Sequence, residues 1–166
     1  MSTILVGVDG SRQSMRALEW AAKEARLRGS ELQVVFAYEF SAAASPAYGY
    51  SGDAAILDKG WRQHQHEQAQ ARLDAESEHA RLHATSTLAG LIDELGELRK
   101  DLTITADAVH DGSPPGHVLI ERSRDAELLV VGSRGLGGFR GLLLGSVSQQ
   151  CAARAHCPVL IVGPHA

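Results

Sequence analysis

The chain has 166 residues and a mass of 17.7 kDa, the usual size of one domain, and we expect residues 1–166 to form one. Its 44% hydrophobic and 22% charged residues are ordinary for a globular protein. The net charge of −4 argues against a general nucleic-acid binder, and no apolar run approaches the ~20 residues of a membrane-spanning helix. We therefore expect no nucleic-acid and no membrane partner.

The first third of the chain predicts a strand, a helix and a second strand. The apolar run Thr3–Val8 is typical of a buried strand and ends at Asp9. Ser11 is suited to cap the helix that follows, and Gly29 is suited to end it. The next apolar run, Leu32–Ala37, predicts the second strand.

The middle of the chain predicts a loop and a long helical segment. Residues Ser41–Ala55 are rich in Ala, Ser and Gly, and their composition fits either a functional loop or a disordered one. From Ile56 to Leu98 the pattern is helical, in one piece or more. A narrow apolar stripe in this charged segment predicts one face packed on a sheet: Ala69, Leu73, Ala80, Ala84, Leu88, Leu91 and Leu95.

The last part of the chain alternates again between apolar runs and helices. Three runs predict strands, Leu102–Val109, Leu128–Val131 and Pro158–Val162. Residues Gly112–Pro115 start a short helix, with proline suited to its first turn, and another helix begins at Ser146. Apolar strands separated by helices indicate a parallel sheet covered on both faces. The predicted fold is therefore an α/β, doubly wound parallel sheet, in which ligands bind at the carboxyl ends of the strands.

The strongest local feature is a glycine-rich loop over Gly132–Gly145, with the sequence GSRGLGGFRGLLLG. Six of the chain's 17 glycines lie in it, and it leads from a buried strand into a helix. A helix start leaves backbone N–H groups free and carries partial positive charge, so this arrangement suits an anion. Ser146 can cap the helix or give its hydroxyl to a phosphate, and Arg134 and Arg140 are the loop's cations. The alternative is a merely flexible connection.

Two familiar phosphate motifs are absent. No lysine follows Lys100, so the loop has no Walker-type lysine, and Arg140 stands where a G-x-G-x-x-G pattern would need glycine. Without that lysine, rapid ATP hydrolysis loses its usual charge stabiliser. No nucleophile with an adjacent base is evident, so the pattern predicts binding rather than catalysis, and we predict no catalytic residue.

The histidines and cysteines do not predict a metal or disulfide site. His79 and His83 are four apart on a predicted helix, but lack an obvious third ligand, and we expect a solvated helix face. Cys151 and Cys157 are too few for a disulfide framework, and we expect core thiols. The first residues lack an export signal, so we expect a cytoplasmic protein.

The spacing Gly132-x2-Gly135-x9-Gly145-Ser146 resembles the motif of the ATP-binding branch of the universal stress protein family. The resemblance extends over nearly the whole chain and includes Ile4–Ser11, Ala126–Gly132 and Cys157–Val162. It implies a single Rossmann-like nucleotide-binding domain whose five-stranded parallel sheet has the order 3-2-1-4-5. It also implies dimerisation and an adenine nucleotide as ligand, with ATP, ADP, AMP and cyclic AMP all open and Mg²⁺ as an option on the phosphates.

The resemblance also implies where a nucleotide is held. Asp9 should meet the adenine or ribose end, unless it only caps the first helix or forms a turn. Ala37 should border the base and Gly112 should lie near the ribose. The phosphate end is implied to use a set of loop and helix residues: Gly132, Ser133, Arg134, Gly135, Gly145, Ser146 and Val147. Phe36 departs from the family, because histidine is common at that position.

Three functional hypotheses follow from the sequence. The first is a homodimeric stress or signalling protein that binds ATP or a related adenine nucleotide. The second is a slow Mg-dependent ATPase that uses the same site, and the third is an interaction protein with a vestigial nucleotide site. We expect the dimer to form through the last strand, because the short apolar segment Val159–Val162 would pair readily as an exposed edge.

Overall fold

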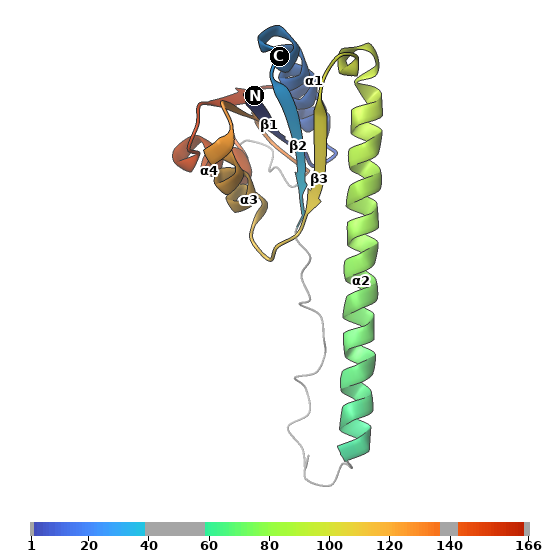
Figure 1. Cartoon of the computed structure of the whole chain (residues 1–166). Helices are drawn as coiled ribbons and strands as arrows, with labels where there is room; N and C mark the ends of the chain where they lie inside the picture. The colour runs from blue at the N-terminus through green and yellow to red at the C-terminus, as the bar shows by residue number, and fades with distance from the viewer. Residues whose placement is uncertain (1, 39–58, 137–142, 165–166) are drawn as a thin grey trace. The chain divides into compact units, whose positions relative to one another are not determined.

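The computed structural model describes residues 2–38, 59–136 and 143–164, with the side chains of 59–66 and 69 not described. The chain divides into two compact units, Met1–Glu39 with Ala84–Ala166, and Phe40–His83. All five strands belong to the first unit (Figure 1). The predicted loop over residues 41–55 lies outside the described residues. In the described part of the chain, no helix is long and apolar enough to cross a membrane.

The sheet has five parallel strands in the order β3-β2-β1-β4-β5, as predicted. The central strand pairs on both sides, so that Val6 lies opposite Val34 on one neighbour and Val130 on the other. All three are fully buried, as is typical of a doubly covered parallel sheet. The strands are β1 (Thr3–Gly7), β2 (Glu31–Ala37), β3 (Ile104–Val109), β4 (Leu128–Gly132) and β5 (Val159–Val162).

Two hydrophobic layers cover the sheet. On one face, α1 (Arg12–Arg28) packs together with the last turns of α2 (Lys59–Glu94). On the other face, α3 (Pro115–Arg122) and α4 (Ser146–Arg154) pack together, and Figure 1 shows this pair across the sheet from α1. The strands supply both layers because successive side chains point to opposite faces.

The ends of α1 follow the predicted capping. The Ser11 hydroxyl accepts a hydrogen bond from the Ser14 N–H at 3.1 Å, which satisfies one of the free donors of the first turn. At the other end, Gly29 has a φ of 65° and its N–H bonds to the carbonyl oxygen of Ala25. Glycine adopts this left-handed conformation without steric cost, so the helix ends there.

The long helix α2 runs without a break from Lys59 to Glu94, and a short 3₁₀ turn, η1 (Gly96–Arg99), follows it. The end of the predicted apolar stripe joins the core: Ala84, Leu88, Leu91 and Leu95 are at most 6% exposed, whereas Leu73 and Ala80 are only partly buried. The stripe is therefore confirmed as a packing face over its last turns.

The strand β3 begins at Ile104, two residues later than predicted. The reason is a turn at residues 99–102, which keeps Leu102 out of the strand. Asp101 has a φ of 65°, and the Leu102 N–H bonds to the carbonyl oxygen of Arg99 at 3.3 Å. An apolar run does not reveal such a turn, so the pattern overestimates the length of the strand.

The two cysteines are free thiols. Cys151 is fully buried in the layer formed by α3 and α4, and burial raises the pKa of its thiol to about 11. Cys157 is partly buried; burial also raises the pKa of its thiol, whose Sγ lies 3.4 Å from the carbonyl oxygen of Pro158. Raised pKa values keep both groups as neutral thiols near pH 7, which agrees with a packing role.

The packing of α2 predicts the effect of two leucine substitutions on this helix. Leu88→Ala removes a side chain that is 4% exposed, and should lower the free energy of unfolding by about 2–5 kcal/mol. Leu82→Ala, at a side chain that is 54% exposed, is the control and should change it by less than about 0.5 kcal/mol. Urea unfolding followed by circular dichroism measures both, and equal effects would contradict the packing described above.

Candidate functional site

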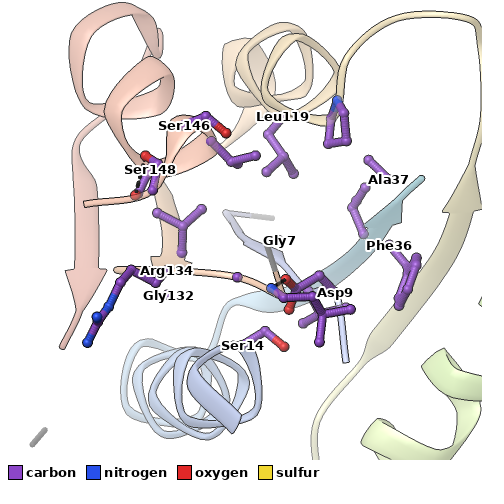
Figure 2. A pocket seen from close by; sticks show the side chains of 18 of the residues that line it. Gly7, Asp9, Ser14, Phe36, Ala37, Leu119, Gly132, Arg134, Ser146 and Ser148 are labelled. Carbon is purple, nitrogen blue, oxygen red and sulfur yellow. Dashed lines mark hydrogen bonds between the residues drawn. The ribbon is translucent and has the colours of Figure 1, made fainter. Parts of the chain in front are cut away.

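A cavity of about 570 Å³ opens at the carboxyl ends of β1, β2 and β4 (Figure 2). This volume is within the usual range for small-molecule sites, and the position is the expected one for a parallel sheet. Eight of the ten predicted site residues line the cavity: Asp9, Ala37, Gly132, Arg134, Gly135, Gly145, Ser146 and Val147. Gly112 and Ser133 are not among its lining residues.

The Asp9 carboxylate connects the beginning of α1 to the glycine loop. Its Oδ1 accepts a hydrogen bond from the Ser11 N–H at 2.9 Å, and its Oδ2 accepts one from the Leu136 N–H at 2.9 Å. The first bond is the turn that the sequence allowed as an alternative role. The second bond joins residues 127 positions apart, and no local pattern predicts it.

Two of the motif glycines lie where a side chain would meet close neighbours. A Cβ at Gly135 would lie 2.2 Å from Oδ2 of Asp9, which is far inside any tolerated distance. A Cβ at Gly132 would lie 3.0 Å from the backbone carbon of Gln13, at the first turn of α1. The glycines therefore let the loop approach Asp9 and the first turn of α1.

The cap of α4 differs from the sequence prediction. Gly145, not Ser146, is the residue that precedes the helix, because its N–H bonds to the carbonyl oxygen of Ser133 at 2.8 Å and holds it extended. Ser148, which the sequence did not predict, also connects the start of α4 to the end of β4. Its hydroxyl lies 2.9 Å from the carbonyl oxygens of both Ser133 and Gly145. The capping role of Ser146 is therefore wrong, and the residue is exposed.

The first turn of α4 presents backbone donors to the cavity. The N–H groups of Ser146, Val147 and Ser148 have no partner within the helix, as at any α-helix start, and no acceptor among the residues that the structure describes. All three residues line the cavity. Free N–H groups and the positive end of the helix dipole together favour an anion at this place.

The opposite part of the cavity is apolar and aromatic. Val8 and Phe36 are buried residues that line it, together with Ala37 at the end of β2. Tyr38 also lines it and stacks on His110, with ring centroids 5.4 Å apart and an angle of 23° between the planes. The sequence does not predict the Tyr38–His110 pair, because the two residues are far apart in the chain and meet only through the pairing of β2 with β3.

Three other predicted residues have different surroundings. Figure 2 shows the Arg134 side chain directed away from Asp9, although the residue borders the cavity. Ser133 is 4% exposed, and its hydroxyl has no hydrogen-bond partner within the described part of the chain. Gly112 has a φ of 81° in the turn before α3. Arg140 lies outside the described residues.

The turn that contains Gly112 is closed by Asp111. Its Oδ1 accepts a hydrogen bond from the Ser113 N–H at 2.8 Å, and this bond lowers the pKa of the Asp111 carboxyl below its usual value. Among the side chains that the structure describes, no three His, Cys, Asp or Glu residues are placed to hold a metal ion.

Comparison with known proteins identifies the family. The model of the universal stress protein family matches residues 1–163. The chain belongs to the universal stress protein family. A universal stress protein of Thermus aquaticus, named for its place in the QAH/OAS sulfhydrylase 3' region, is 33% identical over 162 residues, which cover 96% of this chain and 97% of that one.

Longer relatives and solved structures agree with this assignment. The universal stress protein Rv2624c of Mycobacterium tuberculosis is 33% identical over 98% of this chain, and the chain spans about half of it, 48%. A solved universal stress protein in complex with cAMP has 27% identity and a TM-score of 0.59, over 98% of this chain and 96% of that one. The fold is also that of the Archaeoglobus fulgidus protein in complex with dAMP, with a TM-score of 0.61, 21% identity and 98% of both chains covered.

The contact between Asp9 and the loop predicts a change in hydrogen exchange. Asp9→Ala removes the acceptor of the Leu136 N–H, so exchange of that amide should become about 10- to 100-fold faster, as expected for a lost bond to a charged group. Asp111→Ala is the control, since it removes an equivalent bond to Ser113 in a separate turn. Exchange measured by NMR at Leu136 should not respond to it. An unchanged Leu136 rate in Asp9→Ala would refute the role of this bond.

Proposed function

We propose that the chain binds an adenine nucleotide in the cavity at the carboxyl ends of β1, β2 and β4. The observation that carries this proposal is the set of three N–H groups at Ser146, Val147 and Ser148, which have no acceptor among the described residues and border a cavity next to the close-packed glycine loop. The solved relative in complex with cAMP, at 27% identity, supports an adenine nucleotide as the class of ligand.

The chemistry of the two ends sets the orientation of the nucleotide. Phosphate oxygens only accept hydrogen bonds from the protein, and the first turn of α4 supplies donors with the positive end of a helix dipole. Asp9 carries negative charge and only accepts hydrogen bonds when ionised, so it suits the hydroxyl groups of a ribose and repels a phosphate. The phosphates therefore bind at α4 and the ribose binds near Asp9.

The apolar end of the cavity suits the base. Ala37 is small and leaves room beside Phe36 and Val8, which offer apolar surface to a flat ring. Tyr38 adds an aromatic side chain at the same end, held in place by its stacking on His110. An adenine at this position would bury its faces while the ribose reaches Asp9.

We further propose ATP as the nucleotide and a role in stress or signalling, both on the strength of the glycine motif and the family. Hydrolysis is not part of the proposal. Asp9 is the one carboxylate among the described residues that line the cavity, and both of its oxygens already accept backbone hydrogen bonds. No lysine is present in that lining either, so a fast phosphoryl transfer lacks its usual support.

The proposed site predicts the effect of substituting one glycine. The wild-type protein should bind ATP with a micromolar dissociation constant, which corresponds to about −8 kcal/mol. Gly135→Ala places a Cβ 2.2 Å from Oδ2 of Asp9 and displaces the loop, so binding should weaken at least tenfold. Gly90→Ala, in open space on α2, is the matched control and should leave the affinity unchanged.

Isothermal titration with ATP, ADP, AMP and cyclic AMP measures these affinities, and thermal unfolding of each variant verifies that it is folded. Mass spectrometry of the denatured purified protein identifies any nucleotide that accompanies it. Absence of binding at millimolar concentration, or an unchanged affinity in folded Gly135→Ala, would refute the proposal.

We also propose a homodimer through the edge strand β5, whose residues Val159, Leu160 and Ile161 are only partly buried. Ile161→Asp places a charge on this apolar edge and should halve the mass measured by light scattering at micromolar concentration. Thr105→Asp is the control on β3, the other edge of the sheet, where the side chain is exposed. It should leave the dimer intact, whereas a monomeric wild-type protein would contradict the dimer outright.

A further inference from the structure

The helix α1 has a solvent face of unusual composition. Its buried side is made of small and apolar residues that pack on the sheet. On the opposite side, five exposed residues fall within an arc of about 80° at 3.6 residues per turn, and we call them the α1 outer face: Arg12, Arg16, Trp20, Lys23 and Leu27. The five extend over about 22 Å of the helix, at 1.5 Å per residue.

The apolar members of this face are large and accessible. Trp20 is 41% exposed and Leu27 is 81% exposed, and the two lie two turns apart on the same arc. Single exposed apolar residues are common on any protein, but a tryptophan and a leucine aligned on one helix face form a surface that gains from being covered.

The cationic members are not neutralised within the described structure. Arg28, at the end of α1, pairs with Glu24 and Glu127, but no ion pair within the described part of the chain involves Arg12, Arg16 or Lys23. Positive charge is also concentrated on this helix. It contains five of the chain's 16 lysines and arginines, although the net charge of the whole chain is −4.

We propose that the α1 outer face docks an acidic segment of a partner protein, with apolar side chains interspersed among its Asp and Glu residues. Arg12, Arg16 and Lys23, which form no ion pair with any described residue, select an anionic partner. Trp20 and Leu27 on the same face call for apolar contacts from that partner. Tryptophan and arginine are the residue types that contribute most at protein interfaces, and here both occur on one rigid helix that the core holds in place.

The pattern favours a protein over a membrane or a nucleic acid. A helix that lies on a membrane separates an apolar face, which enters the lipid, from a basic one. In α1 the apolar face is already buried in the core, and the exposed arc mixes both kinds of residue. A nucleic acid would use the cations but has little to gain from the exposed Leu27, and the net charge of −4 opposes it.

The α1 outer face is distinct from the nucleotide cavity. Ser14 is the α1 residue that lines the cavity, and it belongs to the buried side of the helix. A partner on the outer face therefore leaves the cavity open, and the docking inference does not depend on the proposed nucleotide function.

Fluorescence of Trp20 provides a direct test. The full chain carrying Trp61→Phe has Trp20 as its single tryptophan. The probe is a synthetic, fluorescein-labelled 20-residue peptide with Leu at every third or fourth position and Glu, Asp and Ser elsewhere. We expect saturable binding by anisotropy, and with unlabelled peptide a shift of the Trp20 emission to shorter wavelength. Binding should weaken at least fivefold between 50 and 300 mM salt, because exposed charges are screened.

Charge-matched variants locate the binding surface. Replacing Arg12, Arg16 and Lys23 together by Ser should weaken peptide binding at least tenfold, and Trp20→Ala, followed by anisotropy, should weaken it at least threefold. The control replaces three exposed cations outside α1, Lys100, Arg124 and Arg154, by Ser. This variant should change binding by less than twofold. Circular dichroism verifies that each variant is folded.

Four results would overturn the proposal. They are no peptide binding to the wild-type chain, equal weakening by the control variant, equal binding of a peptide with Ser in place of Leu, and tighter binding of another probe through the same residues. The other probes are vesicles of phosphatidylserine and phosphatidylcholine, which stand for a membrane surface, and a 20-base-pair DNA duplex.

Discussion

The loop, the start of α1 and the cavity all depend on the hydrogen bonds of one carboxylate. Asp9 follows β1, the central strand, and accepts the N–H groups of Ser11 and Leu136 on its two oxygens. Without the second bond, the glycine loop would lose its direct connection to Asp9, and the bonds of Gly145 and Ser148 to Ser133 would remain to hold the corner between β4 and α4. Asp9 therefore follows closely on a strand whose residues Ile4, Leu5 and Val6 are fully buried.

The parallel sheet then gives the cavity two chemically different ends. At one end the first turn of α4 presents N–H groups that have no acceptor in the described part of the chain. At the other end, β2 and the residue after it bring Phe36, Ala37 and Tyr38 to the same space. This polarity suits a molecule that is anionic at one end and flat and apolar at the other. It arises from topology, since β1 lies between β2 and β4 and all of these strands end at the same edge.

Much of the fold could be predicted because the relevant signals are local. Strand runs, the Ser11 cap and the Gly29 terminus each follow from a few neighbouring residues, and the glycine spacing predicts the loop between β4 and α4. The predictions were wrong or incomplete where the local structure depends on backbone groups from a distant part of the sequence. Gly145 replaces Ser146 as the cap because its N–H donates a hydrogen bond to the carbonyl oxygen of Ser133, twelve residues earlier in the chain. Tyr38 meets His110 only through strand pairing, so no local pattern reveals it.

The close approach of Gly135 to Asp9 constrains how this sequence can change over evolutionary time. A side chain at position 135 would collide with the Asp9 carboxylate, whereas loss of that carboxylate removes the collision together with the bond to Leu136. Substitutions at positions 9 and 135 are therefore tolerated in one order only. Loss of the aspartate can precede replacement of the glycine, and the reverse order passes through a strained intermediate.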